Sequence, residues 1–94
     1  MLEKKRQGEF TNSALLKLQS YDQKHHTDLV KTFEIFFDHD SNVNETAKAL
    51  NIHPNTLAYR LKRIAEIGEI DLHDINQKVK LYIDIKLAKY EALH

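Results

Sequence analysis

Apolar residues recur along this chain at intervals of three and four positions, the spacing that places side chains on one face of an α-helix. The spacing appears from about residue 13, over residues 27–38, twice within residues 42–67, and over residues 74–92. Only two glycines and one proline are present, which suits helices joined by short polar turns. The sequence therefore predicts an all-α fold of four to five helices with a long C-terminal helix.

Residues 42–67 contain two helix starts separated by a turn of a few residues. Asn42 has the side chain of a good N-cap, and Glu45 three positions later can complete a capping box. Two helices that meet at a steep angle need a small residue at their contact and a residue that tolerates positive φ at the corner. Ala47 and Asn51 meet these needs. The stretch is therefore predicted to be a helix-turn-helix.

The second helix of this motif, expected over residues 54–67, has two faces that differ in chemistry. Pro54 suits the first helical position, and His53 is then the N-cap. At about 100° per residue, Leu57, Leu61 and Ile64 fall on one side. The other side and its flank carry amide, hydroxyl, phenol, ammonium and guanidinium groups: Asn55, Thr56, Tyr59, Arg60, Lys62 and Arg63. Such groups can donate hydrogen bonds to base edges and to phosphate oxygens of DNA.

The charge pattern favours DNA binding over a helix face that is merely solvated. Residues 48–63 hold four basic side chains and no acid, whereas a solvated face usually mixes both signs. The net charge of the chain is zero, which counts against a nucleic-acid binder. The charges are unevenly distributed, however, because residues 9–41 hold six acids and three bases. One end of the molecule is therefore expected to approach a phosphate backbone.

Different residues of the second helix are expected to contact different parts of the DNA. The side that faces away from the apolar residues lies nearest the base edges when the helix enters the major groove, and it carries Asn55, Thr56, Tyr59 and Arg63. Arg60 on the flank is expected to reach a phosphate. His53 and Thr56 lie at the helix N-terminus, where N–H groups also favour phosphate. Lys62 completes the predicted DNA-binding set.

The motif resembles the C-terminal helix-turn-helix domain of PucR-type transcriptional regulators, a group that includes purine-catabolism and sugar-diacid regulators. The resemblance is carried by NVNETAKALNIHPNTLAYRLKRI at residues 42–64, by IDL at residues 70–72 and by YDQKHHTDLVKTFEIFF at residues 21–37. It covers about residues 15–80, and its most specific part is Asn55, Thr56, Tyr59, Arg60 and Leu61. The second helix is also similar to that of Fis-type DNA-binding domains.

The resemblance implies an all-α, Fis/PucR-like domain that binds double-stranded DNA as the reading end of a bacterial-type transcriptional regulator. Regulators of this family usually carry an effector-sensing region upstream, so the chain is expected to be an excised domain or an unusually short member. Two departures from the family pattern affect details. Ala58 stands where a basic residue is common, and Gly68-Glu69 replaces the usual Thr-Gly, which shifts the helix-ending glycine by one position.

Two further helices are expected before the motif. Asn12 or Ser13 can cap a short helix that carries Leu15, Leu16 and Leu18 and ends in a polar link over residues 21–26. Thr27 is expected to cap the next helix, which runs through Asp38. This helix has one broad apolar stripe, typical of a central packing element: Leu29, Val30, Phe33, Phe36 and Phe37.

The last helix, capped by Asp74, has two apolar stripes. One contains Ile75, Val79, Tyr82, Ile83, Leu87 and Tyr90, and the other contains Leu81, Ile85, Ala88 and Ala92. A helix on the outside of a small domain needs only one buried stripe. The Leu81 stripe is therefore expected to contact a partner subunit or to pack on the N-terminal helix. A homodimer is favoured because a two-fold pair places two recognition helices on successive major grooves.

Other function classes lack support in the sequence. Without cysteine there is no disulfide and no Cys-rich zinc site, and the histidines lack metal-site spacing, so neither metal nor cofactor is expected. Neither a nucleophile with a base nor a phosphate loop indicates an enzyme. The chain shows no signal peptide or long apolar segment, which predicts a cytoplasmic protein, nucleoid-associated when bound to DNA.

The expected domain organisation is a flexible polar tail over residues 1–10 followed by one DNA-binding domain over residues 11–94. The alternative from a different class is a helical module that docks protein, or only dimerises, without binding DNA. Duplex binding with a steep salt dependence separates the two hypotheses.

Overall fold

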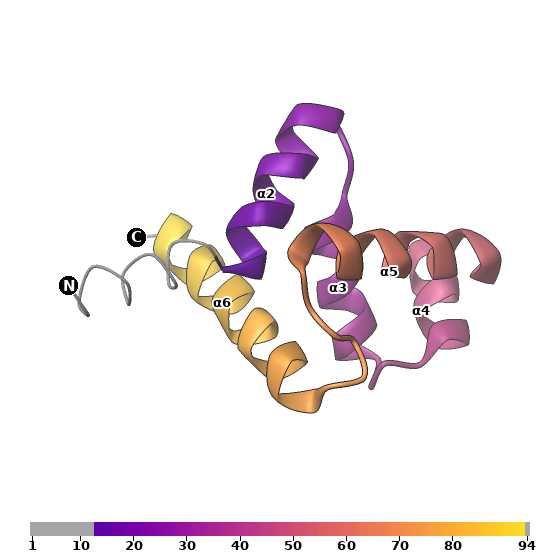
Figure 1. Cartoon of the computed structure of the whole chain (residues 1–94). Helices are drawn as coiled ribbons and strands as arrows, with labels where there is room; N and C mark the ends of the chain where they lie inside the picture. The colour runs from indigo at the N-terminus through magenta and orange to yellow at the C-terminus, as the bar shows by residue number, and fades with distance from the viewer. Residues whose placement is uncertain (1–12, 94) are drawn as a thin grey trace.

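The computed structural model in Figure 1 describes residues 13–93 as five helices around one core. They are α2 (Ala14–His25), α3 (Leu29–Asp38), α4 (Val43–Leu50), α5 (Pro54–Gly68) and α6 (Ile75–Leu93). No strand occurs within residues 13–93. The predicted all-α fold with a long last helix is confirmed. The predicted tail at residues 1–10 lies outside the described residues.

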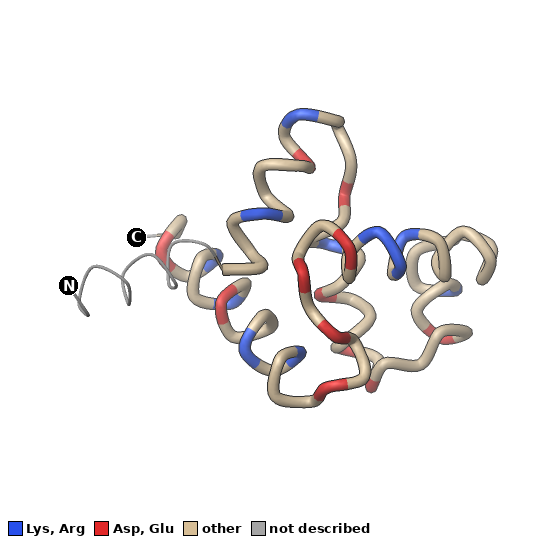
Figure 2. The backbone as a smooth tube through the Cα atoms, viewed as in Figure 1, with Lys and Arg blue, Asp and Glu red and all other residues tan. Residues whose placement is uncertain are grey.

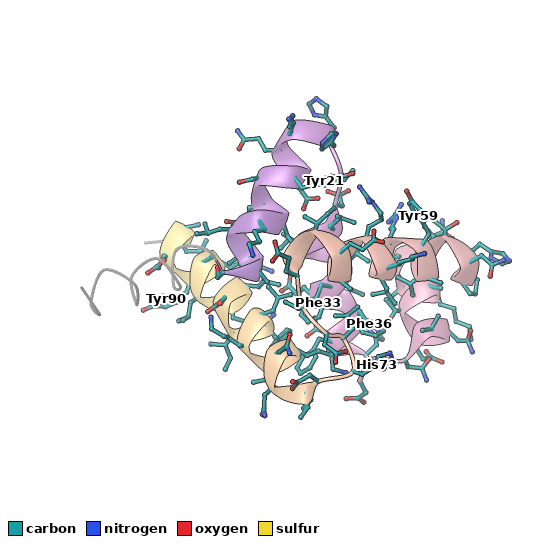
Figure 3. The ribbon with its side chains drawn as sticks, in the orientation of Figure 1. Tyr21, Phe33, Phe36, Tyr59, His73 and Tyr90 are labelled. Atoms are coloured by element: carbon teal, nitrogen blue, oxygen red, sulfur yellow. The ribbon has the colours of Figure 1, made fainter. Side chains whose placement is uncertain are left out.

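Helix α3 is the central element, because it contacts each of the other four helices. Its Phe33 is fully buried, and the rings of Phe36 and Phe37 lie beside it. Figure 3 shows Phe33 and Phe36 in the middle of the molecule, between α5 and α6. The core that surrounds them draws on α2, α3, α5 and α6: Leu15, Leu18, Leu29, Phe33, Phe36, Ile64, Leu81 and Ile85. The predicted aromatic stripe is therefore the packing centre.

Helix α2 is longer than expected. Ser13 caps it, since its hydroxyl accepts a hydrogen bond from the N–H of Leu16 at 3.4 Å. The prediction of a polar link over residues 21–26 is wrong, because α2 continues to His25 and the chain reverses at His26, whose φ is 55°. Tyr21 and His25 lie one turn apart with ring centroids separated by 4.2 Å, a contact that supports the last turns of α2.

The predicted N-cap of α3, Thr27, is also wrong. Helix α3 begins at Leu29 after Asp28, and neither preceding side chain caps it. The carboxylate of Asp22 does so from α2, where it accepts hydrogen bonds from the N–H groups of Leu29 at 2.8 Å and Val30 at 3.0 Å. The hydroxyl of Thr27 donates to the same carboxylate. The carboxylate of Asp22, seven residues before Leu29, therefore caps α3 in place of the neighbouring Thr27.

The helix-turn-helix forms where it was predicted. Asn42 caps α4 by accepting from the N–H of Glu45 at 2.9 Å, and Asn51 reverses the chain at φ 57°. Ala47 is buried where α4 and α5 meet. The reciprocal half of the capping box is wrong, because the N–H of Asn42 donates to the carbonyl of His39 at 2.9 Å rather than to the Glu45 carboxylate.

Helix α5 ends differently from the expectation of a helix-ending glycine. The helix includes Gly68, and the residue in the left-handed conformation is Glu69, with φ 55°. Gly68 faces α2, and a Cβ added there would lie 3.4 Å from the Cβ of Ala14 and 3.6 Å from Leu18, which is ordinary van der Waals contact. The glycine therefore lies at the contact between α5 and α2 and not at the turn.

Helix α6 buries the stripe of Leu81 and Ile85, which pack into the core with α2 and α3 on that side. Packing on the N-terminal helix is thus the correct alternative for this stripe, and its expected contact with a partner subunit is wrong. Asp74 caps the helix as predicted by accepting from the N–H of Asn76 at 2.9 Å. Ile83 and Leu87 on the other stripe are 50% and 55% exposed.

Candidate nucleic-acid interface

Helix α5 is held by its apolar side. Leu57 and Ile64 are fully buried, and the helix contacts α2, α3 and α4. At its N-terminus the ring nitrogen Nδ1 of His53 accepts a hydrogen bond from the N–H of Asn55 at 2.9 Å, so the predicted N-cap is confirmed. These contacts fix which side of α5 faces outward.

The outward side of α5 is polar and accessible from its first turn to its third. Asn55, Thr56 and Lys62 are exposed, and Tyr59 is 64% exposed. Within residues 13–93, the side chains of Asn55 and Lys62 make no hydrogen bond to protein, so their donors are available to a ligand. The structure thus brings these four predicted residues together on one surface, which we call the outer face of α5.

Arg63 departs from the outer face and turns toward α2. Its Nη2 donates to the hydroxyl of Tyr21 at 2.8 Å, and its Nη1 lies 3.2 Å from the carboxylate of Glu66. The guanidinium carbon lies 5.4 Å from the centre of the Tyr21 ring. The hydrogen bond to Tyr21 is the main reason why the pKa of Arg63 is raised, and the side chain stays charged.

Arg60 lies on the flank of α5, as predicted, and is half-buried. Together with Thr56 and Arg63 it forms one wall of a cleft of about 420 Å³, whose opposite wall is the corner between α2 and α3. The cleft therefore joins two basic side chains of the motif to a segment more than 30 positions upstream.

Basic and acidic side chains occupy different parts of α5 and of the loop that follows it. Figure 2 shows the basic residues of α5 clustered in its middle and acidic residues at its end and in the loop that follows. The acids between Arg63 and the start of α6 are Glu66, Glu69, Asp71 and Asp74. A polyanion is therefore attracted to the middle of α5 and repelled from its end.

Tyr21 is the residue that sequence reasoning missed at this surface. It lies within the upstream segment that resembles the family, but no periodicity within α2 relates it to Arg63, 42 positions later. Figure 3 places Tyr21 and Tyr59 on the same side of α5, with Tyr21 projecting from the second half of α2.

Residues 13–93 contain neither a candidate metal site nor a candidate membrane span. No group of three or more His, Cys, Asp or Glu side chains there is arranged to hold a metal ion. None of the five helices combines the length and apolar character that crossing a bilayer requires.

The part of the chain that carries this surface is similar to known transcriptional regulators. Residues 29–87 match the family model described as the PucR C-terminal helix-turn-helix domain. The chain is 54% identical over 85 residues to the DNA-binding transcriptional activator AdeR of Bacillus subtilis (strain 168). These aligned residues make up 90% of this chain and 20% of AdeR. It is 40% identical over 81 residues to the proline-responsive transcriptional activator PutR of the same organism, covering 86% of this chain and 20% of PutR.

A third relative is the carbohydrate diacid regulator of Escherichia coli (strain K12), 41% identical over 59 residues, covering 63% of this chain and 15% of the relative. The chain thus spans about a fifth of the length of the first two relatives. No solved structure matches it. The matched residues include all of α3, α4 and α5, and hence the whole outer face of α5.

Proposed function

The chain belongs to the PucR C-terminal helix-turn-helix family, and from this premise we propose that it reads specific double-stranded DNA sequences with α5 in the major groove. Membership of a family of transcriptional regulators confirms the resemblance found in the sequence and implies DNA binding. Sequence-specific reading is the finer step. Its single strongest support is the outer face of α5, which offers amide, hydroxyl, phenol and ammonium donors in a stretch without an acid.

We assign the base contacts to the outer face of α5, defined above. Asn55 and Lys62 suit adenine and guanine edges respectively, because an amide pairs with adenine N6 and N7 and an ammonium with guanine O6 and N7. Thr56 and Tyr59 complete this set. The side chains assigned to phosphate are His53 at the helix N-terminus, Arg60 and Arg63.

Two copies of the domain are proposed to bind together. Ile75, Ile83 and Leu87 are each at least half exposed on the side of α6 that faces away from the core. A second copy that covers this face forms a two-fold pair, and such a pair matches the symmetry of operators read by dimeric helix-turn-helix proteins. The pairing surface proposed here is the opposite stripe from the one expected at first.

The proposed role also concerns the rest of a longer protein. We infer that residues 11–94 form the DNA-reading domain of a regulator whose effector-sensing region lies upstream, since the matched relatives are more than four times as long as this chain. Such a regulator is a binding protein rather than an enzyme, works in the cytoplasm and associates with the nucleoid when bound to DNA.

Selection of bound duplexes from a random pool tests the proposal. The expected result is a recurrent sequence whose affinity falls steeply as salt rises from about 50 to 200 mM. Enrichment of no sequence, with weak binding to every duplex, would contradict sequence-specific reading. Absence of duplex binding at low salt would favour the alternative, a helical module that docks protein.

A further inference from the structure

We propose that the cleft between α5 and the corner of α2 and α3 binds one phosphate of the DNA backbone, with Arg60 and Arg63 as its ligands and Tyr21 as the residue that positions Arg63. Helix α2 is then a second DNA-contacting element outside the helix-turn-helix. The inference rests on the proposed function, because the phosphate belongs to the duplex that α5 reads.

The cleft has the size and charge that a phosphate requires. Its volume of about 420 Å³ accommodates a phosphodiester, and its walls carry two guanidinium groups and one carboxylate, Asp28. Both oxygens of the neighbouring Asp22 carboxylate are occupied, since they accept hydrogen bonds from the N–H groups of Leu29 and Val30. His26, on the wall opposite the arginines, adds a ring that can donate to an oxyanion.

Tyr21 restricts Arg63 without using up its donors. The phenol hydroxyl accepts a hydrogen bond from Nη2 at 2.8 Å, and the guanidinium lies over the Tyr21 ring. The ring of His25 also packs beside Tyr21, tilted by 33° with the two ring centroids 4.2 Å apart. A guanidinium has five N–H donors, and the contacts with Tyr21 and Glu66 use two of them. Three remain for a phosphate. Because the side chain is already ordered, binding costs less conformational entropy than it would for a mobile arginine.

The position of the cleft matches the path of a DNA strand. Tyr59 of the outer face also borders the cleft, so the two surfaces are continuous. Figure 3 shows Tyr21 rising from α2 on the side of α5 where Tyr59 projects. When a helix lies in the major groove, the phosphates of the strands on either side pass along its flanks. Arg60 and Arg63 occupy such a flank, and the end of α2 stands over it.

Single-site replacement of backbone phosphates by uncharged methylphosphonates tests the proposal on a duplex obtained by the selection described above. At one position of the duplex, the replacement should weaken binding of the unmodified protein, because the arginines of the cleft no longer find a charged phosphate there. Arg63→Ala should lower the salt slope by about one unit. It should also reduce the sensitivity to that replacement, since only Arg60 then remains as a ligand, and leave sensitivity to distant phosphates unchanged. The exposed cation of Lys80 on α6 supplies the matched control, and Lys80→Ala should change neither property.

Tyr21→Phe separates positioning from a structural role. The change keeps the aromatic ring of residue 21 and the charge of Arg63 but removes the hydroxyl acceptor. It should weaken binding by about five-fold, because an arginine that is no longer held in place must be ordered when DNA binds. The loss should vanish on the duplex in which a methylphosphonate replaces the phosphate assigned to the cleft. A loss of equal size on both duplexes would show that Tyr21 acts through the fold and would overturn the positioning role.

The two proposals fail in different ways. If Arg63→Ala binds a selected duplex with an unchanged salt slope and an unchanged methylphosphonate pattern, the cleft is not a phosphate site while sequence-specific binding stands. If the unmodified protein binds no duplex at low salt, the proposed function fails and the cleft proposal falls with it.

Discussion

The carboxylate of Asp22 in the last turns of α2 lies 2.8 Å from the backbone nitrogen of Leu29 and accepts the first N–H of α3. It also accepts the N–H of Val30 at 3.0 Å. The first N–H groups of a helix have no partner within the helix, so Asp22 serves as the N-cap of α3 from the preceding helix. The same bonds fix α2 relative to α3, and thereby place Tyr21 beside Arg63.

Asp22→Ala should destabilise the domain by about 1–2 kcal/mol, the range expected when an N-cap is lost. The cause is the loss of two capped N–H groups at the start of the central helix. Urea denaturation measures the change. Asp28→Ala is the control, because Asp28 makes no side-chain capping bond, and its effect should stay within about 0.5 kcal/mol. A larger loss for Asp28→Ala would show that Asp28 is the effective cap.

Features that depend on neighbours three or four residues apart were predictable from the sequence. The caps at Asn42 and His53, the left-handed corner at Asn51 and the start of α5 at Pro54 all depend on local backbone geometry. The cap of α3 was not predictable in this way. Thr27 has a suitable side chain, but the carboxylate of Asp22 reaches the same N–H groups from across a turn, and only the packed structure shows which acceptor prevails.

The choice between the two apolar stripes of α6 and the orientation of Arg63 also could not be predicted from local sequence patterns. Periodicity identified both stripes, yet it contains no information on which one meets the core, and the structure buries Leu81 while Leu87 stays exposed. Periodicity also placed Arg63 on the polar side of α5. Its bond to Tyr21 joins residues 42 positions apart and depends on how α2 packs on α5. The site residues were thus identified as a set, whereas their neighbours were not.

Gly68→Ala should stabilise the domain by about 0.5–1 kcal/mol. Alanine favours a helix interior over glycine by about that amount, and the added methyl would meet Ala14 and Leu18 at 3.4 to 3.6 Å, which is ordinary contact. Gly68→Val is the control, since its extra methyl groups have no room against α2 and should cost about 1–3 kcal/mol. Thermal and urea denaturation measure both changes. Equal stabilisation by the two variants would show that α2 does not pack closely on Gly68.

Glu34→Gln should destabilise the domain by about 1–2 kcal/mol near neutral pH, because Glu34 accepts charged hydrogen bonds from Lys86 at 2.8 Å and Lys89 at 2.9 Å. Burial acts to raise the pKa of Glu34, but the two lysines outweigh it and hold the pKa below its ordinary value of 4.5. The stabilisation is therefore present above pH 4.5 and is lost as the pH falls through the lower pKa of the folded state.

Unfolding free energies measured across this acidic range check the sign for Glu34. The unmodified protein should lose stability there, and Glu34→Gln should lose less. Asp84→Asn provides the control, because its pair with Lys80 is an exposed i, i+4 contact worth about 0.5 kcal/mol or less. Identical pH profiles for the unmodified protein and Glu34→Gln would rule out a folded-state role for the Glu34 charge.

Leu87→Glu should leave the domain folded and abolish self-association. Leu87 is 55% exposed beside Ile83, so a carboxylate there meets water in the monomer but is desolvated in a pair. Sedimentation should find a monomer with unchanged helicity and weaker binding to a two-fold site. Leu81→Glu is the contrasting variant, since Leu81 is buried and the charge should unfold the domain. If the unmodified protein is already monomeric at high concentration, the pairing proposal fails for this chain.

The last prediction separates residues that read bases from residues that hold phosphate. Asn55 projects from the first turn of α5 without a protein partner among residues 13–93, so Asn55→Ala should cost about 1–3 kcal/mol on the selected duplex and flatten discrimination at one base position. Arg60 lies on the flank, and Arg60→Ala should weaken every duplex alike while lowering the salt slope by about one unit.

Competition against single-base variants of the selected duplex measures the first effect, and affinity across a salt series measures the second. Circular dichroism of each variant ensures that α5 remains helical, because Arg60 is half-buried and could also brace the corner. The two effects should not be interchangeable, since a base contact carries sequence information and a phosphate contact carries charge. If both variants bind all duplexes as tightly as the unmodified protein at low salt, α5 does not lie in the groove, and docking of a protein partner becomes the better account of this surface.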